Sequence, residues 1–100
     1  MYLNYDDTRL HYHTEVLSLL ANPKRLEICI RLLGFEKGVS SLSEELGISQ
    51  SALSQHLTKL RELKLVSVRS CAQFRYYTCE HPGVRQILKV LSENFDRPLD

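Results

Sequence analysis

The sequence lacks several features that would assign it to particular classes of protein. Its 100 residues include no tryptophan, three cysteines, four glycines and three prolines. No apolar run approaches the roughly 18 residues that a membrane-spanning helix needs, so we expect no membrane segment. Three cysteines do not make a disulfide framework, and the acidic, aromatic N-terminus is unlike a secretory signal. These absences predict one cytoplasmic globular domain over residues 1–100, with reduced thiols.

Signatures of catalysis are also missing. The chain contains no phosphate-binding loop, no nucleophile elbow and no HExxH motif. Its adjacent acids Glu44 and Glu45 diverge by about 100° on a helix, which fits solubilising and capping roles better than paired carboxylate chemistry. We therefore expect a protein that is not an enzyme and that requires no cofactor.

Hydrophobic periodicity predicts a mostly α fold with one small β-hairpin, in the order α-α-α-α-β-β-α. This order is typical of a winged helix-turn-helix domain. The predicted helices span about residues 7–20, 23–33, 41–46, 50–63 and 82–95, and the wing spans about 65–79 with strands at 65–70 and 74–79.

Capping residues set the expected helix ends. Asn22 and Ser49 are natural N-caps, and Ser41 with Glu44 matches a capping box. Gly47 supplies the tight turn of the helix-turn-helix, which spans about residues 41–63. The expected inward face of the second helix consists of Leu26, Cys29, Ile30 and Leu33.

The first and last helices carry apolar stripes that lie outside the helix-turn-helix. A monomer of this size would leave much of both stripes exposed, whereas pairing across a two-fold axis would cover them. We therefore predict a homodimer formed through helices 7–20 and 82–95. The stripes consist of Leu10, His13, Leu17 and Leu20 in the first helix, and of Val84, Ile87, Leu88, Leu91 and Phe95 in the last.

The segment from Ser40 to Thr78 gives the most specific functional signal, because a helix-turn-helix followed by a wing is a DNA-reading device. Hydroxyl and amide side chains dominate the outer face of helix 50–63, and such groups suit base edges and phosphates. The alternative is a polar face that is merely solvated. The predicted contacts to double-stranded DNA are Ser49, Gln50, Ser51, Ser54, Gln55, His56, Thr58, Lys59 and Arg61 in the helix, and Arg69, Gln73 and Arg75 in the wing.

The distribution of charge supports the same face. Residues 49–77 hold five Lys and Arg side chains against the single acid Glu62, a net charge of +4. The rest of the chain is therefore −3, since the whole carries +1. A basic patch on an otherwise balanced protein is the electrostatic footprint of a DNA-binding surface.

Three stretches resemble the ArsR/SmtB family of bacterial winged-helix repressors. They are VLSLLANPKRLEICIRLL, SSLSEELGISQSALSQHLTKLRELKLVSVR and FRYYT, and the resemblance covers about residues 16–92. It implies a homodimer formed largely through the first and last helices. It also implies repression of a small operon from a palindromic operator, with release by an inducer such as a metal ion or an oxidising sulfur species.

The inducer sites of that family are not matched. Residues 38–42, where thiolate sensors carry a Cys-x-Cys, contain no cysteine, and near the last helix only His81 could ligate a metal. Cys29 lies close to the first cysteine of the sulfur sensors, but residues 92–100 contain no second one. The inducer is therefore unresolved from the sequence.

Several sensor candidates remain open. Cys29 fits either a small core residue or a redox group, and Cys71 near the wing tip is open to modification. Zinc or a similar ion could be held across two subunits, and its candidate ligands are Cys79, His81, His11 and His13. The rival interpretations are a DNA binder without an effector, one controlled by a protein partner, and a winged-helix module that binds proteins instead of DNA.

Overall fold

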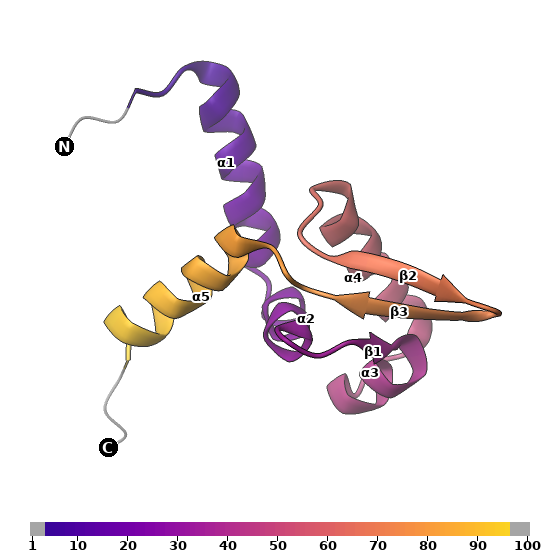
Figure 1. Ribbon diagram of the computed structural model, residues 1–100. Coiled ribbons are helices and arrows are strands. Elements are labelled where there is room, and N and C mark those ends of the chain that lie inside the picture. Colours follow the sequence, from indigo (N-terminus) through magenta and orange to yellow (C-terminus); the bar gives the residue numbers. More distant parts are fainter. Residues whose placement is uncertain (1–3, 97–100) are drawn as a thin grey trace.

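The computed structural model describes residues 4–96 and contains five helices and a three-stranded sheet (Figure 1). The ends of the predicted 1–100 domain lie outside the described residues. In the part that is described, no helix has both the length and the apolarity to cross a membrane. The elements are α1 (Asp7–Leu20), α2 (Pro23–Leu32), β1 (Lys37–Gly38), α3 (Val39–Leu46), α4 (Gln50–Glu62), β2 (Ser67–Cys71), β3 (Phe74–Thr78) and α5 (Pro82–Asn94).

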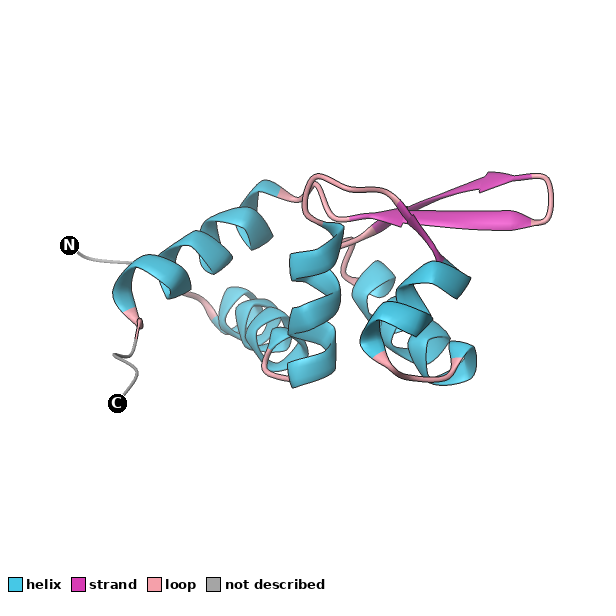
Figure 2. Ribbon diagram, turned by 90° about the horizontal axis from the view of Figure 1, so that it is seen from below, coloured by secondary structure: helices cyan, strands magenta, loops and turns pink. Residues whose placement is uncertain are grey.

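The predicted order of helices and hairpin is confirmed, with one strand added. β1 precedes α3 and pairs antiparallel with β3, so the sheet order is β1-β3-β2. In Figure 2 the hairpin of β2 and β3 projects beyond the helices as a wing. The two-residue β1 is too short to have a periodicity of its own, which is why the sequence pattern did not predict it.

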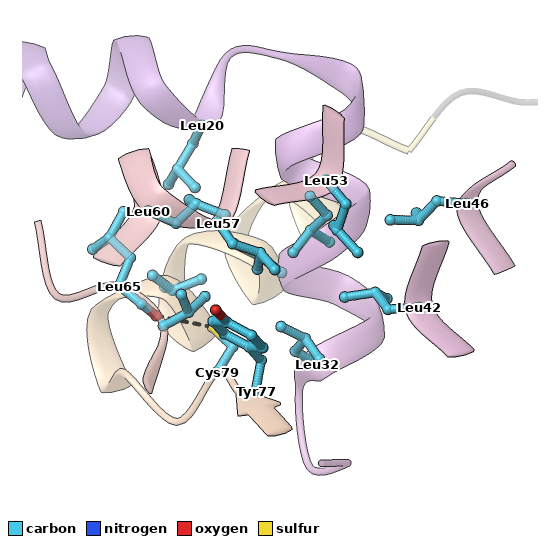
Figure 3. Packing of buried hydrophobic residues seen from close by; sticks show 14 residues of the cluster. Leu20, Leu32, Leu42, Leu46, Leu53, Leu57, Leu60, Leu65, Tyr77 and Cys79 are labelled. Atoms are coloured by element: carbon cyan, nitrogen blue, oxygen red, sulfur yellow. Dashed lines mark hydrogen bonds between the residues drawn. The ribbon is translucent and has the colours of Figure 1, made fainter. Parts of the chain in front are cut away.

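A core of leucines joins the helix-turn-helix to the root of the wing (Figure 3). Leu32 of α2, Leu42 of α3 and Leu57 of α4 are buried together with Tyr77 of β3. The end of α1 and the start of α5 add Leu20 and Val84 to this core. The same packing that stabilises the domain therefore fixes how the wing leaves it.

Two basic residues at the start of α2 connect neighbouring helices. The Lys24 ammonium donates to the Leu46 carbonyl at the end of α3 (2.9 Å), and the Arg25 Nε donates to the Leu19 carbonyl near the end of α1 (2.6 Å). Positive groups at helix C-termini satisfy carbonyls that have no partner within the helix. The predicted N-cap at Asn22 is confirmed, since its side chain accepts from the Arg25 amide.

The predicted capping box of α3 is wrong. The helix begins at Val39 because β1 delivers the chain directly into it, and the Ser41 hydroxyl instead donates to the Glu45 carboxylate (3.3 Å). Glu45 is also more than a solubilising residue, since it pairs with Arg31 and with Lys37, each at 3.1 Å. These pairs tie α2, β1 and α3 together.

The predicted inward face of α2 is rotated from the observed one. Ile28, Cys29 and Leu32 are fully buried, whereas Ile30 is 53% exposed. Positions 28, 29 and 32 share one helical face, and position 30 lies on the opposite side. Because both faces carry apolar residues, the sequence pattern alone did not settle which one packs inward.

Candidate nucleic-acid interface

α4 presents one apolar face and one polar face. Leu53, Leu57 and Leu60 pack into the core, and this packing turns Ser51 and Gln55 outward. The Ser49 hydroxyl caps the helix by accepting from the Ala52 amide (3.1 Å), as the sequence predicted. The outward residues that the sequence assigned to DNA are exposed, and they are Gln50, Ser51, Ser54, Gln55, Thr58, Lys59 and Arg61.

The hydroxyls on this face are not equivalent. Thr58 donates its Oγ1 hydrogen to the Ser54 carbonyl one turn earlier (2.8 Å), so it offers a methyl group and an acceptor oxygen to a ligand. The amide of Gln55 carries both a donor and an acceptor at its tip. Gln55, like Gln50 at the start of the helix, is therefore suited to a bidentate contact with an adenine edge.

His56 lies at the margin of the polar face and is half-buried. Burial lowers its pKa below the ordinary value, and the positive charges of Arg25 and Lys59 lower it further. The imidazole is consequently neutral near pH 7. It can accept or donate a hydrogen bond there without adding a positive charge to the surface.

The wing tip carries Gln73 and Arg75, both exposed. The register pairs Cys71 with Phe74, so Ala72 and Gln73 form the turn, and Ala72 adopts a left-handed φ of 54°. Side chains alternate between the faces of a strand, so Arg75 shares a face with the buried Tyr77. Arg75 therefore points to the helix side of the wing.

A groove of about 550 Å³ lies between the wing and the N-terminal end of α3. The sequence assignment missed Ser40 and Ser41, which line this groove. The N-cap of α3 is Gly38, which supplies no side-chain hydrogen bond. Two predicted DNA contacts of the wing, Gln73 and Arg75, line the same groove as Gln50, a predicted contact of α4.

Arg69, the third predicted wing contact, lies in an ion pair. Its guanidinium donates two hydrogen bonds to the Glu36 carboxylate, both of 2.8 Å. Arg69 raises no positive field of its own at the wing while this pair is formed, because the two charges cancel. Sequence reasoning missed Glu36, which lies 33 residues away and in no motif.

The cysteines fall into two groups. Cys71 is exposed near the wing tip, as predicted, whereas Cys29 and Cys79 are fully buried. Cys79 donates its thiol to the Leu65 carbonyl (3.4 Å), drawn as the dashed line in Figure 3. The hydrogen bond with the Cys79 thiol, and then burial, raise the pKa of Cys29, so that side chain is an unreactive core thiol in the folded protein.

Of the candidate metal ligands, His13 and His81 line one pocket of about 390 Å³, but no third candidate ligand lines that pocket with them. His11 contacts Glu15 (3.0 Å), His13 contacts the Tyr5 hydroxyl (3.0 Å), and the His81 ring accepts from the Gly83 amide. Across residues 4–96, no three His, Cys, Asp or Glu side chains group around a possible ion. A zinc site assembled from two subunits stays a prediction.

α1 and α5 expose several large apolar side chains, as Ile30, Phe35 and Phe74 also do elsewhere in the domain. Leu10 and Leu17 of α1 are 57% and 60% exposed, and Phe95 at the end of α5 is 70% exposed. Both helices also project from the compact part of the molecule (Figure 1). This is the surface that the sequence assigned to dimerisation.

Comparison with known proteins places these features in context. The family described as "Bacterial regulatory protein, arsR family" matches residues 22–68. Nodulation protein NolR of Rhizobium meliloti is 48% identical over 84 residues, 84% of this chain and 69% of that protein. Transcriptional activator HlyU of Vibrio cholerae serotype O1 is 43% identical over 76 residues, 76% of this chain and 70% of HlyU. The crystal structure of NolR from Sinorhizobium fredii, 43% identical, superposes with a TM-score of 0.84 and covers 93% of this chain and 95% of that one.

Proposed function

The chain belongs to the arsR family of bacterial regulatory proteins, and on that premise we propose that it is a homodimeric repressor of transcription. α4 enters the major groove of a palindromic operator, and the wing contacts the flanking backbone or minor groove. The protein catalyses no reaction in this proposal, and its place of action is the bacterial cytoplasm, where its DNA target lies. Its inducer is left open.

The observation that carries this proposal is the outer face of α4. Ser51, Ser54 and Gln55 are exposed while the opposite leucines are buried, so the polar groups are held outward on a rigid helix. Lys59 and Arg61 follow toward the C-terminal end, where they can reach phosphates. Short hydrogen-bonding side chains followed by basic ones match a helix that reads bases and is held by the backbone.

The apolar faces of α1 and α5 support the dimer. Six large apolar or aromatic side chains on these two helices and at their ends are at least 40% exposed, and a second copy would bury them. A two-fold dimer also presents two copies of α4, which suits a palindrome with half-sites one helical turn apart. The six are Leu10, Tyr12, Leu17, Val90, Leu91 and Phe95.

Repression follows from occupancy. A dimer seated on an operator that overlaps a promoter excludes polymerase sterically and needs no further interaction surface. HlyU, by its name, is an activator. The direction of regulation therefore depends on where the operator lies, and we propose the blocking position.

Fluorescence anisotropy with the reduced, metal-free protein tests the proposal. We expect a preference of about a thousandfold for the DNA upstream of its own gene over a scrambled duplex at near-physiological salt. Equal, weak binding to both duplexes would contradict a repressor that is active without a ligand. Repeating the titration with zinc, arsenite, peroxide and polysulfide then searches for the inducer.

Two substitutions separate base reading from backbone contact. Gln55→Ala should relax the preference at one base pair of each half-site, at a cost of about 1–3 kcal/mol. Lys59→Ala should instead weaken binding to every sequence and reduce the salt slope by about 0.9 for each phosphate that is no longer neutralised. If both variants reduce specificity and slope equally, the two roles are assigned wrongly.

The dimer has its own test. Leu17→Glu and Leu91→Glu each place a charge on the exposed apolar faces, and we expect both to shift sedimentation toward the monomer and to weaken operator binding. Gln86→Glu adds the same charge at an exposed polar position of α5 and is the matched control. A wild-type monomer at micromolar concentration would overturn the proposed assembly.

A further inference from the structure

An ion pair crosses the sheet of the wing, from β2 to the residue before β1. Arg69 belongs to β2, and Glu36 directly precedes β1, which lies across β3 in the sheet. The Arg69 Nε and Nη2 donate to the two different oxygens of Glu36, each at 2.8 Å. Two parallel charge-assisted bonds fix the orientation of both side chains, which a single contact would not.

Tyr76 belongs to β3, the strand between β1 and β2. The Arg69 guanidinium stacks over its ring at 4.8 Å from the centroid. The register places Tyr76 opposite Arg69 on one side and opposite Gly38 on the other. A Cβ at Gly38 would lie 3.6 Å from the Tyr76 ring, so the ring rests close over β1. Arg69, Tyr76 and Glu36 thus form one side-chain layer across β2, β3 and the segment that leads into β1.

This layer lies on the face of the wing opposite Arg75. Tyr77, next to Tyr76, is buried in the core, and Arg75 shares the face of Tyr77 by alternation. Arg69 and Tyr76 therefore extend from the other face of the hairpin, and Tyr76 also lines the groove between the wing and α3. The positive charge of Arg69 is matched there by Glu36, and Arg69 holds the pKa of that carboxyl below its usual range, so the pair stays ionised at neutral pH.

We infer that Arg69 is a positioning residue of the DNA-binding surface, which acts through Glu36 and Tyr76 to fix the angle of the wing, and is not itself a phosphate contact. The inference rests on the proposed function, because the wing angle matters only if Gln73 and Arg75 meet DNA. We call Arg69, Glu36 and Tyr76 together the brace. The brace orders β2 and β3 before binding, so that less conformational entropy is lost when the wing binds DNA.

Three variants separate this role from a phosphate contact. In operator titrations we expect Arg69→Lys, Arg69→Gln and Glu36→Gln each to weaken binding about fivefold, because lysine lacks the bidentate fork and the planar stack. The double variant Arg69→Gln/Glu36→Gln should bind no more weakly than either single one. The salt slope should stay at the wild-type value in all four, since no phosphate contact is removed.

Glu80→Gln is the matched control for removal of an acid. Glu80 is exposed, follows β3 and makes no ion pair within residues 4–96, so its substitution should not weaken binding. A phosphate contact by Arg69 would give a different result. Arg69→Lys would then bind like the wild type, Arg69→Gln would lower the salt slope, and Glu36→Gln would tighten binding, and this pattern would overturn the inference.

Hydrogen exchange of the free protein provides a readout that needs no DNA. We expect the amides of β2 and β3 to exchange faster in Arg69→Gln and Glu36→Gln, with those of α4 unchanged. Unchanged exchange in the wing would refute the brace even if operator binding fell. Absence of operator binding by the wild type would refute the proposed function while leaving the exchange result to decide whether the brace exists.

Discussion

Leu57 of α4 and Leu17 of α1 are the same residue in the same kind of secondary structure, yet one is 1% exposed and the other 60%. Leu57 packs where the helix-turn-helix, the wing root and the start of α5 converge. Leu17 lies on a helix that projects from this core (Figure 1). The difference separates a region that is buried within one chain from a region whose apolar surface one chain leaves exposed, the surface on which we propose that a second copy packs.

The largest effect should come from breaking the first region. Leu57→Ala removes most of a buried side chain and leaves a cavity in the core, and we expect a loss of about 3 kcal/mol in the free energy of unfolding. Leu17→Ala should instead give a loss that is largest at high protein concentration and shrinks as the protein is diluted, because it removes stabilisation that only subunit association supplies. Urea denaturation at several protein concentrations distinguishes the two. Equal losses that do not depend on protein concentration would contradict the idea that Leu17 is buried by a second subunit.

A substitution just after α4 should have a smaller effect, and this effect should be an increase in the free energy of unfolding. Lys64 adopts a left-handed φ of 59°, and the next amide, of Leu65, donates to the Leu60 carbonyl (2.9 Å). Glycine avoids the steric cost of that conformation, so Lys64→Gly should raise the free energy of unfolding by about 1 kcal/mol. Lys64→Ala removes the same charge but keeps a Cβ, and it should give no comparable gain. Matched thermal melts of the two variants provide the check.

His56 lies at the border of the core, and its effect should be smaller still. Burial and then Arg25 and Lys59 lower its pKa in the folded protein, so the unfolded chain binds a proton more readily. Its contribution is therefore complete above the unfolded pKa of about 6.5 and is lost as the pH falls through that value toward the folded pKa. His56→Gln should flatten the pH dependence of unfolding in this range. An unchanged profile would show that His56 does not couple to folding.

The reactivity of the three cysteines tests the distinction between buried and exposed regions without any substitution. In the native, reduced protein we expect a thiol reagent to modify Cys71 rapidly and to leave Cys29 and Cys79 unmodified until the core unfolds. Mass spectrometry should find one adduct before denaturation and three after it. Fast modification of all three would mean that the core opens far more readily than its packing implies.

The sequence predicted most of the local structure because local signals determine it. α1 and α5 have the predicted ends to within one residue, and Asn22, Ser49 and Gly47 act as caps as expected. The outward face of α4 was also correct, since three leucines at helical spacing leave only one polar side. The contacts of that face with DNA stay predictions.

Features that depend on distant residues were missed or misassigned. β1 exists only because β3 lies beside it, and that pairing moved the start of α3 from Ser41 to Val39. Cys29 and Cys79 contact each other in the core although they are 50 residues apart. Neither lies in a sequence motif that predicts this contact.

The sequence by itself determined the helices, their caps, the polar face of α4 and the family, because each is encoded in residues close along the chain. Only the tertiary structure decided that Ile30 faces outward, that Glu45 joins three elements and that Arg69 is paired with Glu36. The physical reason is that hydrogen bonds and ion pairs between distant residues depend on where the backbone brings them, and composition and periodicity do not carry that information.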